Sequence, residues 1–233
     1  MTPEHSTLVA MRTIKSFVVR TGRMTASQQE AYDSYLPRYG LHIEDGPLDQ
    51  QQAFGRLAPL VLEIGFGMGQ SLIAMAKAHP GWDYIGVEVH PPGIGNLLRG
   101  IHDEGLSNLR VYRGDAKDVL AINIAEQQLS RLQIFFPDPW HKTRHHKRRL
   151  IQADFIQSVL PKLAPGGVIH LATDWEPYAQ QMMAVLSAFP DLGNVFGAGQ
   201  WASTHERPLT KFEKRGQKLG HGVWDLVFAK RVP

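Results

Sequence analysis

Leu60-Val61-Leu62-Glu63-Ile64-Gly65-Phe66-Gly67-Met68-Gly69 is the stretch of the 233-residue chain that decides its fold. Residues 60–64 form a short apolar run, which predicts a buried β-strand. Three alternating glycines follow, and residues 69–78 carry apolar side chains at three- and four-residue spacing, which predicts a helix. A strand that enters a helix through a glycine-rich turn is typical of the first unit of a doubly wound α/β sheet.

The rest of the chain repeats this alternation of strand-like and helix-like segments. Short apolar runs flanked by Gly, Pro or Asp predict strands, and apolar residues at every third or fourth position predict helices. Strands are predicted at residues 84–88, 109–112, 132–136, 168–172 and 224–230, and helices at 95–104, 117–128, 149–163 and 175–189. Repeated strand–helix units imply parallel strands with right-handed crossovers. We predict a doubly wound, mostly parallel, Rossmann-like α/β sheet with helices on both faces and an antiparallel C-terminal strand.

Two regions are predicted within the chain. Residues 1–55 form a basic N-terminal extension, in which helical spacing and a capping Ser27 predict a helix over residues 27–35. Residues 56–233 form a single domain, because 233 residues with 43% hydrophobic content suffice for one sizeable core. We expect part of the extension to be mobile and to close over bound ligands.

Composition excludes several classes of chemistry. The chain has no cysteine, so disulfides, thiolate nucleophiles and Cys-ligated metal sites are excluded. The eleven histidines are too scattered for a metal site. No apolar run approaches the roughly 18–20 residues that span a bilayer, and residues 1–11 lack the layout of a signal peptide. We therefore expect a cytoplasmic protein without a membrane segment, a metal ion or an obligatory protein partner.

A carboxylate occurs at the end of each of four successive predicted strands. Ligands of doubly wound sheets bind at the carboxyl ends of the strands, so we expect these four side chains to meet: Glu63, Glu88, Asp115 and Asp138. Any one of them could be a helix cap or a surface acid, but four in register indicate a ligand site. Glu88 is placed to accept hydrogen bonds from a ribose diol, and Asp115 from an adenine amino group.

The glycine turn narrows the choice of ligand. Gly65, Gly67 and Gly69 allow a ligand to approach the backbone at the start of a helix, as in NAD-dependent and S-adenosylmethionine-dependent enzymes alike. Glu63 precedes the turn by two residues, and its charge disfavours a pyrophosphate and favours the cationic sulfonium or amino group of S-adenosylmethionine. The residues therefore favour S-adenosylmethionine as the cofactor. A nicotinamide-dependent oxidoreductase on the same fold is the alternative.

Phe135-Phe136-Pro137-Asp138-Pro139-Trp140 closes the fourth of these strands. Proline on both sides restricts the backbone, so Asp138 is expected on a stiff loop. Residues 141–149 then hold five Lys or Arg, three His and no acid. Further basic residues gather near both ends of the chain, at Arg12, Lys15, Arg20 and Arg23 and at Arg207, Lys211, Lys214, Arg215 and Lys218. This arrangement indicates a reaction site beside a surface for a polyanionic substrate. The alternative is a stiff turn followed by a solvated basic helix.

Seven motifs extend this pattern along the chain. They are SFVVR at residues 16–20, LEIGFGMG at 62–69, GVEVH at 86–90, FFPDPWHK at 135–142, ATDWEPY at 172–178, TKFEKRG at 210–216 and GHGVWDL at 220–226. Together they resemble the bacterial tRNA (guanine-N7-)-methyltransferase family. The glycine motif is shared by many methyltransferases, whereas the Pro-Asp-Pro-Trp and Thr-Lys-Phe-Glu elements are specific to this family.

The resemblance implies a Rossmann-like methyltransferase fold and a defined reaction on tRNA. The family transfers a methyl group from S-adenosylmethionine to N7 of a guanosine in the tRNA variable loop (guanosine 46), forming 7-methylguanosine and S-adenosylhomocysteine. Guanine N7 has a lone pair and no proton, so the help expected is alignment and a carboxylate that stabilises the growing positive charge. Asp138 is the first candidate, with Asp174 or Glu213 as alternatives. Another methyl acceptor, a ribosomal RNA base or a small molecule, is the main alternative substrate.

The resemblance also implies roles for individual residues. Cofactor contacts are expected at Glu63, Gly65, Gly67, Gly69, Glu88, Asp115 and Asp138. Substrate contacts are expected at Lys142, Asp174, Thr210, Lys211, Phe212 and Glu213, and RNA contacts at Arg144, His145, His146, Lys147, Arg148 and Arg149. Trp140, Tyr178 and Phe212 are candidates for stacking against a guanine. Whether Asp138 contacts the base or the cofactor, and whether the chain is a monomer or a dimer, stay open.

Overall fold

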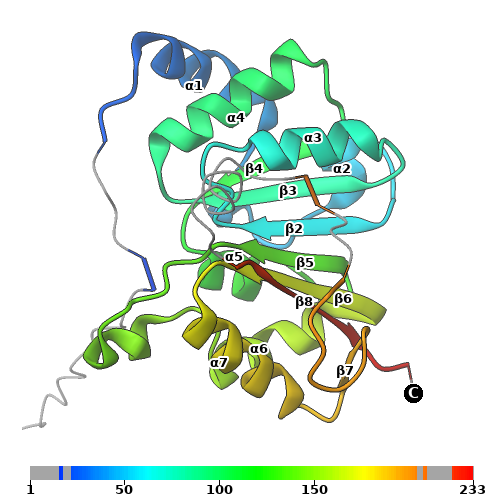
Figure 1. Ribbon diagram of the computed structural model, residues 1–233. Helices are drawn as coiled ribbons and strands as arrows, with labels where there is room; N and C mark the ends of the chain where they lie inside the picture. Colours follow the sequence, from blue (N-terminus) through cyan, green and yellow to red (C-terminus); the bar gives the residue numbers. More distant parts are fainter. Residues whose placement is uncertain (1–15, 18–21, 204–206, 209–221, 233) are drawn as a thin grey trace, which may run out of the picture.

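The computed structural model describes residues 16–17, 22–203, 207–208 and 222–232 of the chain (Figure 1). These residues form an eight-stranded sheet with the strand order β1-β4-β3-β2-β5-β6-β8-β7. The strands are β1 (Gly40–Leu41), β2 (Leu60–Ile64), β3 (Asp83–Glu88), β4 (Leu109–Arg113), β5 (Leu129–Phe135), β6 (Leu163–Thr173), β7 (Leu192–Asn194) and β8 (Trp224–Lys230). Neighbouring strands are parallel except where β8 pairs with β6 and β7. The predicted doubly wound, mostly parallel sheet with an antiparallel C-terminal strand is confirmed.

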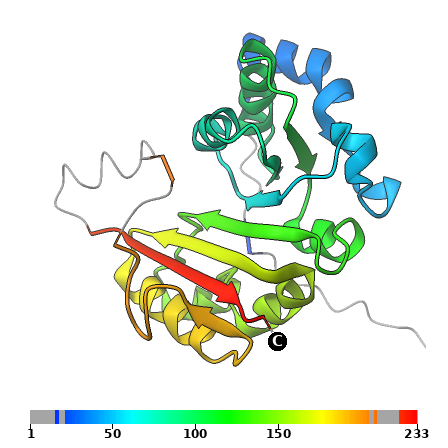
Figure 2. The same cartoon turned by 90° about the vertical axis from the view of Figure 1, so that its right-hand side faces the viewer.

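Helices cover both faces of this sheet, as Figure 2 shows from the side. One layer holds α1 (Ala26–Tyr39), α3 (Gln70–Ala78) and α4 (Pro91–Asp103), and the other holds α5 (Ala116–Ile122), α6 (Ala153–Val159) and α7 (Glu176–Ser187). Alternate residues of β2 are buried in the two layers, which is why this strand is apolar along nearly its whole length. Short helices occupy the connections: α2 (Gln50–Phe54), η1 (Ile43–Asp45), η2 (Thr143–Arg148) and η3 (Leu160–Lys162). None of the helices in the described ranges is long and apolar enough to cross a membrane.

Several helix boundaries differ from those predicted: α1 ends at Tyr39 rather than at residue 35, and α6 ends at Val159 rather than at residue 163. α4 begins at Pro91 rather than at residue 95, because proline is well suited to the first helical turn, where its missing N–H has no partner to lose. α5 ends at Ile122 rather than at residue 128, and the side chain of Asn123 donates to Ile43 O at 3.0 Å and Gly46 O at 2.6 Å. Residues 149–152 are not helical, and α6 begins only at Ala153.

The described part of the predicted extension packs onto the sheet domain. α1 is capped by Thr25 and not by the predicted Ser27: Gln28 N donates to Thr25 Oγ1 at 3.2 Å, and Thr25 N donates to Gln28 Oε1 at 2.9 Å, which forms a capping box. Arg113 of β4 donates to the Tyr32 hydroxyl at 2.9 Å, and β1 pairs with β4. The predicted mobility of the extension also concerns residues 1–15 and 18–21, which lie outside the described residues.

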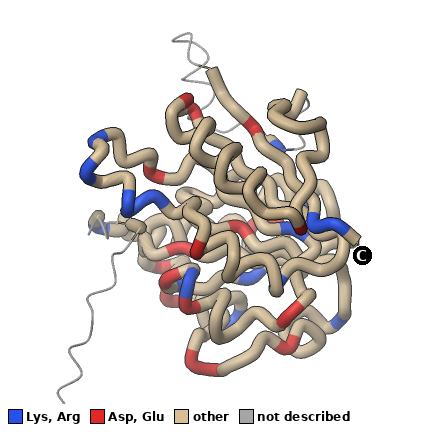
Figure 3. The backbone as a smooth tube through the Cα atoms, turned by 90° about the horizontal axis from the view of Figure 1, so that it is seen from below, with Lys and Arg blue, Asp and Glu red and all other residues tan. Residues whose placement is uncertain are grey.

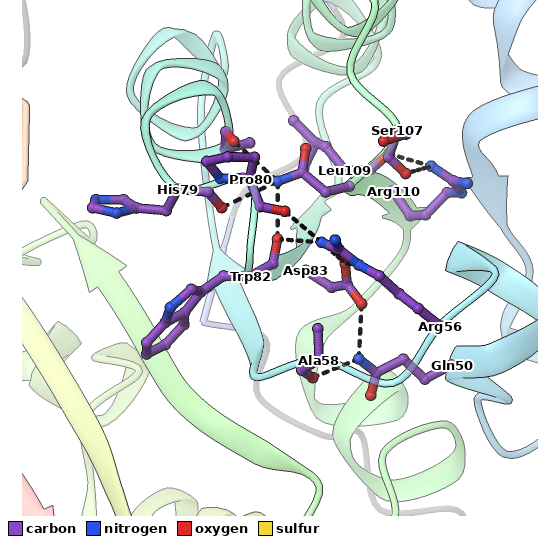
Figure 4. A network of polar contacts seen from close by, with 12 residues as sticks. Gln50, Arg56, Ala58, His79, Pro80, Trp82, Asp83, Ser107, Leu109 and Arg110 are labelled. Atoms are coloured by element: carbon purple, nitrogen blue, oxygen red, sulfur yellow. Dashed lines mark hydrogen bonds and ion pairs between the residues drawn. The ribbon is translucent and has the colours of Figure 1, made fainter.

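A buried polar network ties the connection before β2 to the start of β3 (Figure 4). The Asp83 carboxylate is fully buried and accepts hydrogen bonds from Arg56 Nε at 3.0 Å, Arg56 Nη2 at 2.7 Å and Gln50 Nε2 at 2.9 Å. Gln50 Nε2 also donates to Ala58 O at 2.7 Å. The network lies at the amino ends of β2 and β3. It therefore fixes the end of the sheet that is opposite to the predicted ligand site.

Asp83→Asn is expected to lower the free energy of unfolding by about 2–4 kcal/mol, because the variant replaces a buried anion with an amide whose NH2 group faces other donors. Guanidinium-induced unfolding measures the loss. Asp103→Asn is the matched control, since Asp103 is exposed and its pair with Arg99 at 3.5 Å should be worth less than about 0.5 kcal/mol. Equal losses in the two variants would contradict the prediction.

Candidate functional site

A cavity of about 410 Å³ opens at the carboxyl ends of the central strands, where the strand order reverses between β2 and β5. Its wall includes Gly65 and Gly67 after β2, Glu88 at the end of β3, Asp115 after β4 and Asp138 after β5. Doubly wound sheets bind their ligands at such a reversal, and the volume is that of an ordinary small-molecule site. The structure thus brings together three of the four strand-end carboxylates that the sequence singles out.

The Glu88 carboxylate is oriented by three backbone N–H groups. Gly67 N donates to Oε2 at 3.0 Å, and Val89 N and His90 N donate to Oε1 at 2.7 Å and 3.1 Å. A carboxylate has about four lone-pair sites, so these bonds fix the group and leave it capacity to accept from a ligand hydroxyl. A carboxylate held in this way can accept hydrogen bonds from a diol such as that of a ribose.

The turn after β2 leaves its backbone open to the cavity. Gly65 and Gly67 have φ values of +74° and +58°, and a Cβ atom at either position would meet no atom of the described residues within 4 Å. The backbone conformation favours glycine, and the open space beside it lets a ligand reach the peptide groups. Ile134 and Leu150 add apolar wall to the same cavity. Apolar wall, an oriented carboxylate and open backbone fit the adenine, ribose and methionine parts of S-adenosylmethionine.

Asp115 combines two functions at the start of α5. Its Oδ1 accepts from Lys117 N at 3.1 Å and so caps the helix, and the residue also lies on the cavity wall. A cap uses one carboxylate oxygen, which leaves the other for a donor such as an adenine amino group. The two interpretations of Asp115, helix cap and ligand contact, are therefore compatible.

Glu63 and Gly69 do not lie on the cavity wall. Glu63 is buried on the face of β2 that α3 covers, and it accepts a hydrogen bond from Gln133 Nε2 at 2.6 Å. Burial, partly offset by the Gln133 bond and reinforced by the charge of Glu88, raises the pKa of Glu63 to about 7. Gly69 is the N-cap of α3, and a Cβ atom there would lie 2.6 Å from Leu97 of α4. These two residues therefore belong to the packing between β2, α3 and α4 behind the cavity wall, and they do not face the cavity.

Glu63→Gln is expected to change how stability depends on pH. The folded protein binds the Glu63 proton more tightly than the unfolded chain does, because the pKa rises from 4.5 to about 7 on folding. The contribution of Glu63 to wild-type stability should therefore fall, by about 3 kcal/mol in total, as pH rises through that window. Gln has no proton to lose, so the variant should gain stability relative to the wild type between about pH 5 and about pH 8.

Guanidinium unfolding at several pH values measures this difference directly. Glu126→Gln is the control, because it makes the same chemical change at an exposed position. A Glu63→Gln difference that does not change with pH would show that Glu63 does not titrate in this range.

The loop that carries Asp138 has an unusual backbone. Phe136 and Trp140, the residues on either side of Pro137-Asp138-Pro139, have φ values of +53° and +46°. A bulky residue in this region costs of order 1–3 kcal/mol, so neighbouring groups must hold the loop in shape. Phe136 N donates to Ala172 O at 2.8 Å, and Trp140 Nε1 donates to Ser16 O at 3.2 Å. Asp138 is thus presented to the cavity by a loop that several elements constrain.

The basic segment after this loop divides into exposed and buried residues. Lys142, Arg144 and Lys147 are exposed, and Arg148 lies over the Trp140 ring with 4.1 Å between the guanidinium carbon and the ring centre. Figure 3 shows Lys and Arg gathered on this projecting segment, on the left of the view. Arg149, in contrast, is buried and donates from Nε to Pro139 O at 2.8 Å. Arg149 is therefore not placed to contact a phosphate, contrary to the role expected from sequence.

The aromatic residues expected to stack on a guanine are differently placed. Tyr178 is fully buried, accepts from Ile151 N at 3.1 Å, and has its pKa raised to about 12, chiefly by burial. It cannot stack on a base. Trp140 is half-buried between Arg148 and the N-terminal segment, and Phe212 lies outside the described residues. Trp175, which was not among the residues predicted to stack on a base, is exposed. Its ring is edge-on to that of His141, with 4.4 Å between the ring centres.

The remaining expected site residues are exposed or outside the described ranges. Asp174 is exposed at the end of β6, His145 and His146 are half-exposed on η2, and Thr210 to Glu213 lie outside the described residues. Ser16, Phe17 and His90 line the cavity although no role was expected for them. All three belong to sequence motifs noted above, at residues 16–20 and 86–90, which was the signal available. Among the described residues no group of three His, Asp or Glu is close enough to hold a metal ion.

Comparison with known proteins gives these observations a family context. Residues 57–226 match a family described as putative methyltransferases. The chain is 53% identical, over 95% of its length and 97% of the relative's, to a tRNA (guanine-N(7)-)-methyltransferase of Saccharophagus degradans. It is 57% identical, over 94% of its length and 92% of the relative's, to one of Pseudomonas putida strain W619. The crystal structure of the 16S rRNA methyltransferase KamB matches 78% of this chain and 92% of its own, with a TM-score of 0.55 and 13% identity, which shows a common fold.

Proposed function

The chain belongs to the family of tRNA (guanine-N(7)-)-methyltransferases, and from this premise we propose that it methylates N7 of guanosine 46 in the tRNA variable loop. When bound, S-adenosylmethionine supplies the methyl group on a cationic sulfur. The products are 7-methylguanosine in tRNA and S-adenosylhomocysteine, and such a substrate implies a cytoplasmic location. Family membership argues against the nicotinamide-dependent oxidoreductase considered from sequence.

The observation that supports this proposal best is the position of Asp138 between a cofactor-like cavity and a basic segment. Glu88 and Asp115 lie on the cavity side of the loop. Lys142, Arg144 and Lys147 follow the loop and are exposed. RNA affinity comes mainly from phosphate contacts of such side chains, which a small-molecule substrate would not require. We therefore favour RNA over a small methyl acceptor.

Each residue of the cavity has a limited task in this proposal. Glu88 accepts from the ribose hydroxyls, Asp115 accepts from the adenine amino group, and the open backbone at Gly65 and Gly67 accommodates the rest of the cofactor. Guanine N7 needs no general base, because it carries a lone pair and no proton. Asp138 stabilises the positive charge that the purine gains as N7 is alkylated, and alignment of the reacting atoms supplies the remaining acceleration.

The substrate side of the proposal rests on exposed polar residues. Lys142 precedes η2, two residues after Trp140 of the reaction loop, and Asp174 directly follows β6, the strand that pairs with β5. Phosphate contacts are assigned to the η2 segment without Arg149: Arg144, His145, His146, Lys147 and Arg148. Thr210, Lys211, Phe212 and Glu213 are assigned to the substrate from the family resemblance alone, since they lie outside the described residues.

Methyl transfer from labelled S-adenosylmethionine to unmodified tRNA transcripts tests the proposal. A transcript whose variable-loop guanosine 46 is changed to adenosine is the matched substrate. We expect label on the first transcript alone, at a position that is cleaved by chemistry specific for 7-methylguanosine. Equal labelling of both transcripts would refute the assignment of guanosine 46, and label on neither would refute tRNA as the substrate.

A further inference from the structure

The shape of the Asp138 loop needs an explanation beyond its prolines. Proline restricts φ at residues 137 and 139 but does not favour positive φ at the aromatic residues on either side. The structure must therefore contain contacts that hold Phe136 and Trp140 in this conformation. Two buried arginines make such contacts: Arg149, ten residues after Pro139, and Arg207 from a distant part of the chain.

Arg207 holds the first side of the loop. Its guanidinium carbon lies 5.4 Å from the centre of the Phe135 ring and 5.2 Å from that of Phe136. The same guanidinium donates to both oxygens of Asp225 on β8, from Nε and from Nη2, each at 2.8 Å. Asp225 also contacts His170 Nε2 at 2.9 Å, and Asp225, His170 and Arg207 are all buried. Arg207 is thus fixed to the sheet and presents its flat cation to the ring of Phe136.

Asp225 stays charged over the whole range in which the protein would be assayed. Burial alone would raise the pKa of Asp225, but hydrogen bonds from His170 and Arg207 lower it to about 2. Since an ionised carboxylate only accepts hydrogen bonds, His170 Nε2 must carry the proton that it shares with Asp225. Arg207 and Asp225 therefore form an ion pair at every pH at which the protein would be assayed.

Arg149 holds the second side of the loop. Its Nε donates to the Pro139 carbonyl at 2.8 Å, directly before Trp140. Its guanidinium lies 4.7 Å from the centre of the Tyr178 ring and also donates to Gln181, both on α7. The carbonyl of the second proline is thus tied to a buried cation that α7 orients. Lysine could not reproduce this set of contacts, because it lacks the planar fork of donors.

We propose that Arg207 and Arg149 are positioning residues that hold the Asp138 loop in its strained conformation, and that methyl transfer depends on both. The kinetic part of this inference rests on the proposed function. The structural part does not, since it concerns only the loop.

Arg207→Lys tests the proposal, with Arg56→Lys as a matched control. Arg56 makes two hydrogen bonds to the buried Asp83 (Figure 4). This pair lies at the amino ends of β2 and β3, the end of the sheet opposite to the Asp138 loop. Hydrogen exchange of a peptide covering residues 135–142 should be at least about 10-fold faster in Arg207→Lys and unchanged in Arg56→Lys. For methyl transfer to tRNA, kcat should fall at least about 10-fold, with KM and the S-adenosylhomocysteine dissociation constant within about threefold of wild type.

The outcomes separate a positioning role from a merely structural one. Normal exchange in residues 135–142 of Arg207→Lys would overturn the proposal, as would the same increase in Arg56→Lys, which would mark a general loss of stability. Asp225→Asn, which retains the size of the side chain, takes the place of Arg207→Lys if that variant does not fold. Arg149→Lys should give the same two effects. If the wild type fails to methylate tRNA, the proposed function fails, while the exchange measurement still decides whether the arginines hold the loop.

Discussion

Asp138→Asn is expected to lower kcat for methyl transfer to tRNA by about 100- to 1,000-fold, the usual cost of removing one group that stabilises charge in a transition state. Asparagine keeps the size of the side chain and one acceptor oxygen, but it has no charge to offset the positive charge on the alkylated purine. The prolines beside it and the contacts of Phe136 and Trp140 do not involve the carboxylate. The loop should therefore keep its shape, and the loss should be in chemistry.

Measurements of cofactor affinity separate the two contacts that Asp138 could make. If Asp138 faces the guanine, the dissociation constant for S-adenosylhomocysteine should stay within about threefold of the wild-type value. The reason is that S-adenosylhomocysteine does not contain the base that Asp138 would contact. Asp118→Asn is the matched control, since Asp118 is exposed on α5 and should leave kcat unchanged. Normal kcat and normal S-adenosylhomocysteine binding in the variant would show that Asp138 takes no part in the reaction. Normal kcat with weak S-adenosylhomocysteine binding would show that Asp138 contacts the cofactor instead.

The fold was predictable because its signals are local. Buried parallel strands such as β2 and β3 are short apolar runs, and the positions of five of the predicted strands follow directly from that pattern. β1 and β7 have two and three residues, too few for any periodicity, and were not predicted. Helix ends were missed where tertiary contacts decide them: α5 stops where Asn123 turns to the backbone of η1.

The sequence allowed us to predict the site residues that follow the end of a strand. It did not allow us to predict the direction in which individual side chains point. Residues after a strand, such as Asp115 and Asp138, reach the cavity because the chain leaves the sheet there. Glu63 is still within β2, and the alternation of side chains directs it to the face under α3. Arg149 follows eight exposed or half-exposed residues, 141–148, in a basic run, and only the distant Tyr178 and Gln181 reveal its burial. Such long-range contacts leave no local pattern.

Glu88→Ala is expected to weaken S-adenosylhomocysteine binding by at least about 100-fold, because two hydrogen bonds to a charged acceptor are worth about 1.5–3 kcal/mol each. The variant also removes the acceptor that orients three backbone N–H groups, of Gly67, Val89 and His90. The glycine turn and the start of α4 would then lose their common partner. Isothermal titration of the ligand, together with the increase in melting temperature that it causes, measures the loss.

The kinetic consequence of Glu88→Ala differs from that of Asp138→Asn. Cofactor binding should limit the variant, so KM for S-adenosylmethionine should rise about 100-fold while kcat at saturation falls much less. Glu126→Ala is the matched control, because Glu126 is exposed on the turn after α5 and should leave both constants unchanged. Normal affinity in Glu88→Ala would mean that the ribose is held elsewhere and that the three N–H bonds to Glu88 serve the turn alone. A large loss of kcat with normal KM would instead place Glu88 beside the reacting atoms, which is the role proposed here for Asp138.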